Sequence, residues 1–250
     1  MWTLLLLALL VGVRAGVEDG GIIGGHVVAP HSKPWMASLF SKERKKQTCG
    51  GALVSRNFVL TAAHCSINHF SDVYVVLGVQ NTAKPEPSWQ TFRSVTPHSR
   101  AYDSKTREHD IVLLKLSKPA VLNHMVQVIP LPSRARDIAA GTVCSVAGWG
   151  WTQVDGPMSN VLREVNVTVV DNAVCKEELG LGRRLKDSML CAGKHNEGKD
   201  AGVNDSGGPL VCDGRVEGIV SHGTVKSPPG VYTRVSKYLE WIKKTLGNSG

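Results

Sequence analysis

A serine in a glycine-rich turn is the first residue of this chain that could perform covalent chemistry. Ser206 lies in the segment Asn204-Asp205-Ser206-Gly207-Gly208, where the glycines permit close approach of the backbone to a substrate. A serine hydroxyl is a weak nucleophile, so it needs a base within hydrogen-bond reach and a third group that orients this base. His64 and Asp110 have the chemistry for these two roles, and His, Asp, Ser is a known chain order of catalytic triads.

Each of these stretches also has a plain structural explanation. A Ser between an Asp and two glycines is ordinary turn composition, a lone His is more often structural, and an Asp before a strand is usually a cap or a surface turn. The combination is far more specific, because His64 follows the run Leu60-Thr61-Ala62-Ala63 and Asp110 precedes the apolar run 111–116. We therefore predict a nucleophile, a base and an orienting acid at Ser206, His64 and Asp110.

These stretches resemble the motifs of the chymotrypsin-like serine proteases, and the resemblance extends from Ile22 to about Leu246. Further segments that match the family are Ile22-Ile23-Gly24-Gly25, Cys49-Gly50-Gly51, Ala147-Gly148-Trp149-Gly150 and Pro229-Gly230-Val231-Tyr232. The resemblance implies an all-β fold of two six-stranded antiparallel β-barrels with a C-terminal helix. It places the active site in the cleft between the barrels.

The hydrophobic pattern favours strands in its own right. Short apolar runs occupy residues 73–77 and 111–116, and residues 162–170 alternate, with three valines on one face. Gly, Pro, Asn and Asp separate such runs at the intervals that are typical of all-β chains. One segment, Tyr238–Leu246, repeats apolar residues at helical spacing and is followed by Gly247, so we predict a C-terminal helix there.

The N-terminal segment has the pattern of a secretory leader. Residues 4–13 are apolar but too few to span a bilayer, and a small residue ends the segment, so we predict a signal peptide over residues 1–15. Residues 16–21 are then a propeptide, and residues 22–250 form the protease domain. Gly21 precedes Ile22 where tryptic activation would need Arg or Lys, so a dipeptidyl peptidase suits this leader better. We expect a secreted chain, extracellular or stored in a secretory granule, without a membrane span.

Six cysteines in a secreted chain suggest disulfides, and the sequence alone allows fifteen pairings. The resemblance implies the pairs Cys49–Cys65, Cys144–Cys212 and Cys175–Cys191. No cysteine pair has the spacing of a zinc site and no His-Glu-x-x-His motif occurs, so we infer neither a catalytic metal nor another cofactor.

The chain is basic, with a net charge of +8 at pH 7. Removal of residues 1–21 takes away one Arg and two acids and raises the charge to +9. Basic runs at 42–46, 183–186 and 243–244 are either solvated loops or a surface that attracts acidic polymers such as glycosaminoglycans and proteoglycans. Nucleic-acid binding is not expected, because no recognised motif or interleaved aromatic residues accompany the charge.

The resemblance assigns roles to the residues around the triad. The backbone N–H groups of Asn204 and Ser206 would form the oxyanion hole. The amine that propeptide removal frees at Ile22 would pair with Asp205, because a buried carboxylate needs such a partner. Asn204 stands where the family has Gly, but Asn tolerates a left-handed backbone well and keeps the N–H group.

The resemblance also locates a specificity pocket. Asp200, six residues before Ser206, stands where trypsin-like members carry an acid at the base of the pocket. Gly223 and Gly230 match wall positions that stay small, and Ser221 matches a serine beneath the catalytic Asp. Together these residues predict cleavage after Lys or Arg. The family's aromatic residue beside the substrate backbone is replaced by His222, and the absence of a disulfide near the pocket resembles the granzyme, chymase and cathepsin G group.

We interpret the chain as a monomeric serine endopeptidase of haematopoietic type. Its partners would be protein or peptide substrates and protein protease inhibitors. The alternative is a weakly active or inactive homologue that acts as a basic antimicrobial or glycosaminoglycan-binding protein. Asn166-Val167-Thr168 is a glycosylation sequon on the polar face of its strand, whereas a glycan on the second sequon, at Asn204, would block the proposed site.

Overall fold

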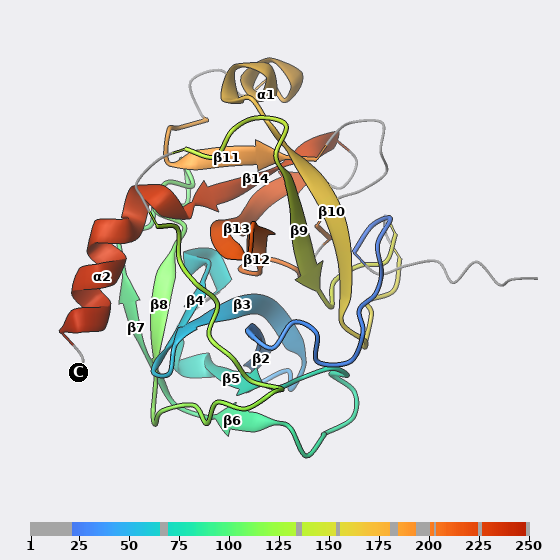
Figure 1. Ribbon diagram of the computed structural model, residues 1–250, viewed down its shortest axis with the longest axis vertical. Helices are drawn as coiled ribbons and strands as arrows, with labels where there is room; N and C mark the ends of the chain where they lie inside the picture. Colours follow the sequence, from blue (N-terminus) through green and yellow to red (C-terminus); the bar gives the residue numbers. More distant parts are fainter. Residues whose placement is uncertain are drawn as a thin grey trace, which may run out of the picture.

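The computed structural model describes residues 22–65, 70–133, 137–153, 156–180, 185–193, 201–202, 204–224 and 227–248. The predicted signal peptide and propeptide lie outside these residues, and so does Asp200. Within the described part, the chain forms two antiparallel sheets that lie one above the other (Figure 1).

The N-terminal half of the chain forms a curled sheet of seven strands in the order β6-β5-β2-β3-β4-β8-β7. Its inward-facing side chains include Leu39, Leu53, Leu60 and Leu113, all essentially inaccessible to solvent. The strands are β2 (Met36–Ser41), β3 (Gln47–Ser55), β4 (Phe58–Thr61), β5 (Val73–Leu77), β6 (Gln90–Phe92), β7 (Val95–Ser99) and β8 (Val112–Leu116). A 3-10 turn, η1 (Ala63–Cys65), follows β4, and a second, η2 (Phe70–Asp72), precedes β5.

The second sheet has the order β1-β10-β11-β14-β13-β12-β9; its strands come from the C-terminal half except β1, which comes from the N-terminal end of the chain. Pairing of β9 with β10 closes six of these strands into a barrel. The strands are β1 (His26–Val27), β9 (Val143–Gly148), β10 (Arg163–Val170), β11 (Met189–Ala192), β12 (Pro209–Cys212), β13 (Arg215–Thr224) and β14 (Ser227–Arg234). The alternation in β10 is as expected: Val165, Val167 and Val169 are buried, whereas Asn166 is exposed. The predicted all-β fold with a C-terminal helix is confirmed. Of the two six-stranded barrels expected, the C-terminal one is closed, whereas the N-terminal one is a curled, seven-stranded half-barrel among the described residues.

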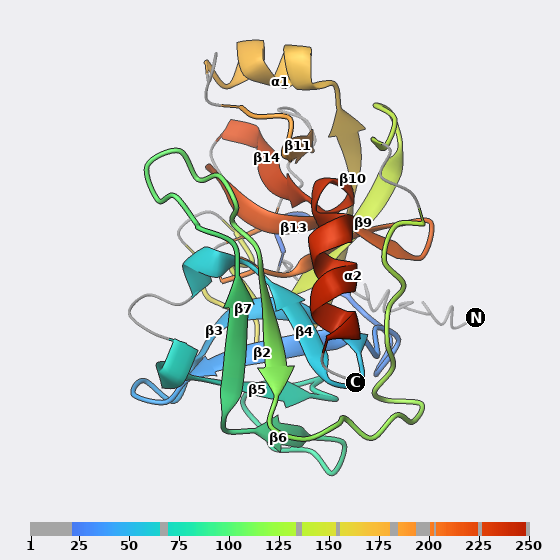
Figure 2. The same cartoon turned by 90° about the vertical axis from the view of Figure 1, so that its left-hand side faces the viewer.

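Helix α2 (Leu239–Gly247) ends the fold, one residue later along the chain than predicted. A short 3-10 segment, η4 (Val235–Tyr238), leads into it. Leu239 and Ile242 belong to the same core cluster as Phe58 and Leu113 of the first sheet. The element that follows the second barrel therefore packs back on the first, and α2 runs beside that sheet in Figure 2.

Helix α1 (Asn172–Glu178) was not predicted. It is only seven residues long and buries little apart from Cys175, so it lacks the apolar periodicity of a longer helix. Its one readable signal is Asp171, whose carboxylate accepts a hydrogen bond from the N–H group of Ala173 at 2.7 Å and so caps the helix.

The three disulfides implied by the family resemblance are confirmed: Cys49–Cys65, Cys144–Cys212 and Cys175–Cys191. The two halves also share a buried contact, because Trp149 of the second half donates from its indole Nε1 to the carbonyl oxygen of Gln80 at 3.2 Å. Trp149 clusters there with Met36 and Phe40 of β2. This packing fixes one barrel against the other, which any site built from both barrels requires.

No helix in the described part of the chain is both long and apolar enough to cross a lipid bilayer.

Candidate active site

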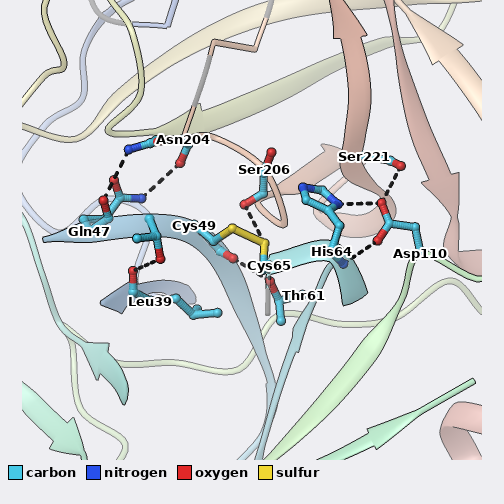
Figure 3. Close-up of a disulfide and its surroundings, with 12 residues drawn as sticks. Leu39, Gln47, Cys49, Thr61, His64, Cys65, Asp110, Asn204, Ser206 and Ser221 are labelled. Atoms are coloured by element: carbon cyan, nitrogen blue, oxygen red, sulfur yellow. Dashed lines mark hydrogen bonds and ion pairs between the residues drawn. A yellow bond between two sulfur atoms is a disulfide. The ribbon is translucent and has the colours of Figure 1, made fainter. Parts of the chain in front are cut away.

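A cleft of about 660 Å³ is lined by residues from both halves of the molecule. His64 and Asp110 come from the first sheet and its connections, and Ser206 comes from the loop before β12. In the view of Figure 3 the His64 ring lies between Ser206 and Asp110. The three residues singled out by their chemistry, which lie far apart in the sequence, therefore line one cavity.

Asp110 holds His64 at two points. Its Oδ2 atom lies 2.7 Å from Nδ1 of the His64 ring, and its Oδ1 atom accepts the backbone N–H of His64 at 2.9 Å. The first contact requires the ring proton on Nδ1, so the opposite nitrogen, Nε2, is free to accept a proton. This tautomer and orientation suit a general base.

The second barrel completes the surroundings of Asp110. The Ser221 hydroxyl on β13 donates to Oδ2 at 2.6 Å, and the Thr233 hydroxyl on β14 donates to the Asp110 carbonyl oxygen at 2.8 Å. Burial alone would raise the pKa of Asp110, which is only 1% exposed, but the hydrogen bonds and charge of His64 and the hydrogen bond from Ser221 outweigh burial and hold the pKa below its usual value. Asp110 is therefore a stable carboxylate.

Ser206 is tied through its backbone to the first barrel. Gly50 on β3 donates its N–H to the Ser206 carbonyl oxygen at 2.8 Å, and Sγ of Cys65 lies 3.6 Å from the same oxygen. The next residue, Gly207, has a φ of +79°, and a Cβ atom there would collide with Thr61 and with the Gly50 carbonyl oxygen. Only glycine fits this turn, so the serine is held in place by neighbours from the other barrel.

The oxyanion loop begins at Asn204, which has the left-handed backbone expected of it, with a φ of +74°. Within the described part of the chain, the N–H groups of Asn204 and Ser206 have no hydrogen-bond partner. Two such donors beside the Ser206 hydroxyl are what the predicted oxyanion hole requires.

Gln47, at the start of β3, is a neighbour of this loop that the sequence did not reveal. Its Nε2 donates to the Asn204 carbonyl oxygen at 3.0 Å, and Nδ2 of Asn204 donates to the Gln47 carbonyl oxygen at 3.2 Å (Figure 3). Nδ2 of Asn204 also contacts Sδ of Met158 at 3.2 Å. These contacts engage the carboxamide of Asn204, which supports the interpretation of its sequon as coincidental.

Asp205 is fully buried, and its carboxylate accepts the N–H groups of Gly150 and Gly202 at 2.8 and 2.7 Å. The carboxylate also lies directly against Gly148, where any side chain would displace it. Ile22 is buried as well, in the core cluster of the second barrel, and its φ of +48° is unusual for a β-branched residue.

The predicted specificity pocket is only partly within the described residues. Gly223 and Gly230 lie on the neighbouring strands β13 and β14 and line the cleft, and a Cβ atom on Gly223 would lie 3.2 Å from the Cα atom of Gly230. The close approach of the two strands therefore favours glycine at position 223. Ser221 lines the same cleft, whereas Asp200 lies outside the described residues.

His222 continues the polar chain behind the site. Its Nδ1 atom lies 3.0 Å from the Ser221 oxygen, and because the single Ser221 proton already goes to Asp110, this nitrogen must be the donor. Burial, and then the positive charge of Arg107, lower the pKa of His222 to about 4. His222 is therefore neutral at pH 7, and its Nε2 atom is an acceptor.

Among the described residues, one group of potential metal ligands lies close together: Cys49, His64 and Cys65. Both sulfur atoms belong to a disulfide, so neither offers a thiolate to a metal ion.

The fold and the site together are those of the double-barrel serine hydrolases. A family model described as Trypsin matches residues 22–242. Chymase of Canis lupus familiaris is 42% identical over 248 residues, which cover 97% of this chain and 96% of that protein. Granzyme B of Homo sapiens is 43% identical over 249 residues, and granzyme H of Homo sapiens 41% over 247, in each case over 97% of both chains.

The chain therefore belongs to the trypsin family, and it is a serine endopeptidase of the chymase and granzyme type. The family predicted from the motifs is confirmed.

Proposed function

We propose that this protease cleaves peptide bonds through Ser206, His64 and Asp110. The observation that carries the proposal is the His64 ring, held by a buried Asp110 at 2.7 Å in the cleft that Ser206 also lines. Ser206 Oγ attacks the substrate carbonyl carbon while His64 Nε2 takes its proton. His64 then gives this proton to the leaving amine, and water hydrolyses the acyl-enzyme by the same route in reverse. Asp110 stabilises the imidazolium ion that forms.

The N–H groups of Asn204 and Ser206 supply the oxyanion hole. Neither is engaged elsewhere in the described part of the chain, and Gln47 holds the Asn204 carbonyl in a fixed direction. The loss of one such donor costs about 10²–10³ in rate in comparable sites. The family's Gly at this position is thus replaced without loss of the donor, which argues against the non-catalytic alternative.

Activation would follow from a free amine at Ile22. The buried carboxylate of Asp205 holds two backbone N–H groups of the neighbouring loops, and the Ile22 side chain already lies in the core of the same barrel. A new α-ammonium group beside Asp205 would supply a counter-charge. Chains that begin at Gly16 and at Ile22 should differ strongly in turnover of a small ester substrate, and equal turnover would refute this mechanism.

The substrate preference we propose is for Lys or Arg at the cleaved position. Gly223 and Gly230 add no side chain to the wall of the cleft, and Asp200 would neutralise the charge of a bound Lys or Arg, because a cation buried without a counter-charge is costly. The test is a peptide library cleaved by the chain that begins at Ile22. We expect Asp200→Ser to remove most of the basic preference, and an aromatic or aliphatic preference in the unmodified enzyme would overturn the assignment.

A fluorophosphonate probe tests the reaction class itself, because it labels only an activated serine. The matured chain should be labelled, and Ser206→Ala should not. An unlabelled matured chain would favour the binding-protein alternative.

We also propose a secreted or granule-stored monomer that binds glycosaminoglycans through exposed cations, among them those of the β2–β3 turn at residues 42–46. Such charges are screened over about 8 Å at physiological salt. Retention on heparin should therefore fall steeply as salt rises, and retention that salt does not change would contradict this surface. Protein inhibitors would be the remaining class of partner.

A further inference from the structure

A guanidinium lies on the wall of the catalytic cleft. Arg107, in the loop between β7 and β8, lines the cleft beside Tyr102, Ser104 and His222. Its charge lowers the pKa of His222 and counteracts the increase that burial causes in the pKa of Tyr102, so the guanidinium lies near both rings. Within the described part of the chain, this guanidinium makes no hydrogen bond or ion pair.

The acids nearest to Arg107 in the sequence are engaged elsewhere. Asp103 Oδ1 accepts the backbone N–H groups of Lys105 and Thr106, at 2.8 and 3.3 Å. Glu108 lies 3.8 Å from the ammonium of Lys186. Asp110 is committed to His64 and Ser221, as described above. The loop therefore presents a cation without supplying its counter-charge.

The backbone at this position is also unusual. Arg107 has a φ of +61°, and its N–H donates to the Asp103 carbonyl oxygen at 2.6 Å in a tight turn. A left-handed backbone at a residue other than Gly costs about 1–3 kcal/mol and is found most often at ligand-binding and active sites. The turn thus fixes the backbone from which the exposed Arg107 side chain extends.

We propose that Arg107 selects substrates with a Glu or Asp shortly before the cleaved residue. The inference rests on the proposed function, because the cleaved residue would lie against Gly223 and Gly230, and His222 adjoins this wall on the same strand. Upstream substrate side chains then pass His222 and come within reach of Arg107. A guanidinium binds a carboxylate by two parallel hydrogen bonds, and the neutral His222 adds no competing charge.

The primary test compares two peptides that differ only by Glu or Gln at the second residue before the scissile bond, with a second pair for the third residue. For the chain that begins at Ile22, we expect kcat/KM to be about three- to tenfold higher for Glu in at least one pair, mainly through KM. The preference should shrink in high salt. A Glu-to-Gln ratio near one in both pairs would overturn the proposal.

Variants of the same loop separate Arg107 from the general charge of the protein. In Arg107→Gln, and in Arg107→Asn, which tolerates the left-handed backbone, the ratio should fall to about one. Lys105→Gln removes the same charge from an exposed residue of this loop that does not line the cleft, and it should keep the ratio of the unmodified enzyme. An unchanged ratio in both Arg107 variants would refute the assignment.

Binding to the Ser206→Ala variant separates this inference from the proposed function. Fluorescence anisotropy should show tighter binding of the Glu peptide than of the Gln peptide, and Arg107→Gln in the same background should abolish the difference. If the matured enzyme neither turns over peptides nor reacts with fluorophosphonate, the proposed reaction fails, yet this difference still supports an acid-binding site at Arg107. Equal binding of the two peptides to Ser206→Ala would overturn it.

Discussion

The two ends of the cleft are held in different ways. At one end, Asp110 is nearly inaccessible and its carboxylate accepts three hydrogen bonds, two from His64 and one from Ser221 of the other barrel. At the other end, the loop at Asn204 is joined to the first barrel mainly by a reciprocal pair of amide contacts with Gln47. The carboxylate end is therefore held by several hydrogen bonds to one buried group, whereas the end where we propose the oxyanion hole depends on contacts with one amide side chain.

The largest effect should come from breaking the carboxylate end. Asp110→Asn keeps the shape of the side chain but places an amide opposite Nδ1, so the ring no longer has its proton on that nitrogen. We expect kcat to fall about 10³–10⁴-fold in a variant that is still folded by circular dichroism. A loss below tenfold in kcat would show that His64 does not depend on Asp110.

Gln47→Leu should break the other end with a smaller effect. The Asn204 carbonyl loses its donor, so the 204–205 peptide and the backbone angles at Asn204 are held less firmly. The adjoining 203–204 peptide, which carries the Asn204 N–H, is then also less firmly aimed at the substrate. Because we propose that this N–H acts in the transition state, kcat should fall about 10–100-fold while KM changes little. This decrease does not exceed the decrease expected when a whole oxyanion-hole donor is lost.

Gln127→Leu is the matched control for this variant. It removes a similar bond, from Nε2 to the Asn123 carbonyl oxygen, at an exposed site that does not line the cleft, and it should leave kcat unchanged. Equal kcat values for the two Leu variants would show that Gln47 does not position the oxyanion loop.

The pH dependence of folding stability tests the environment of His222, which lies next to Ser221 at the carboxylate end of the cleft. The pKa of His222 is about 4 in the folded protein, below the ordinary value of 6.5, so the unfolded chain takes up this proton first. Folding stability should therefore fall as pH is lowered from 6.5 to 4. After discounting for partial exposure, we expect about 1–2 kcal/mol from this residue. Urea unfolding at both pH values should show a smaller decrease for His222→Gln, and parallel decreases would contradict the assignment.

The smallest effect is expected for Asn204→Gly. The backbone conformation is already left-handed and the N–H is retained, so kcat/KM should rise by less than tenfold, or about 1.4 kcal/mol. A gain of several hundredfold would mean that Asn204 has dismantled the oxyanion hole. The binding-protein alternative would then become the better explanation.

The parts of the site that the sequence predicted are those with a local signature. Ser206, His64 and Asp110 each lie in a short motif, and the alternating valines of β10 mark its buried face without reference to any other strand. The left-handed backbone at Asn204 was expected from the family resemblance, because the family has Gly at this position and Asn tolerates this conformation.

The remaining contacts depend on tertiary structure. Gln47 and Asn204 are 157 residues apart and meet through amide groups that carry no periodic pattern. The availability of Arg107 depends on where Asp103 and Glu108 find their partners, and Glu108 reaches a lysine on a distant segment. Neither the Gln47–Asn204 contact nor the availability of Arg107 can be predicted from the sequence before the fold is known.

The division of the reacting groups between the barrels has a consequence for the cell that makes the protein. His64 and Asp110 leave the ribosome in the first half of the chain, but the backbone bond from Gly50 to Ser206 forms only after the second half has been made and docked. A truncated or half-folded product therefore contains no working protease. Completion of the fold is therefore itself a safeguard against premature digestion of other proteins in the cell.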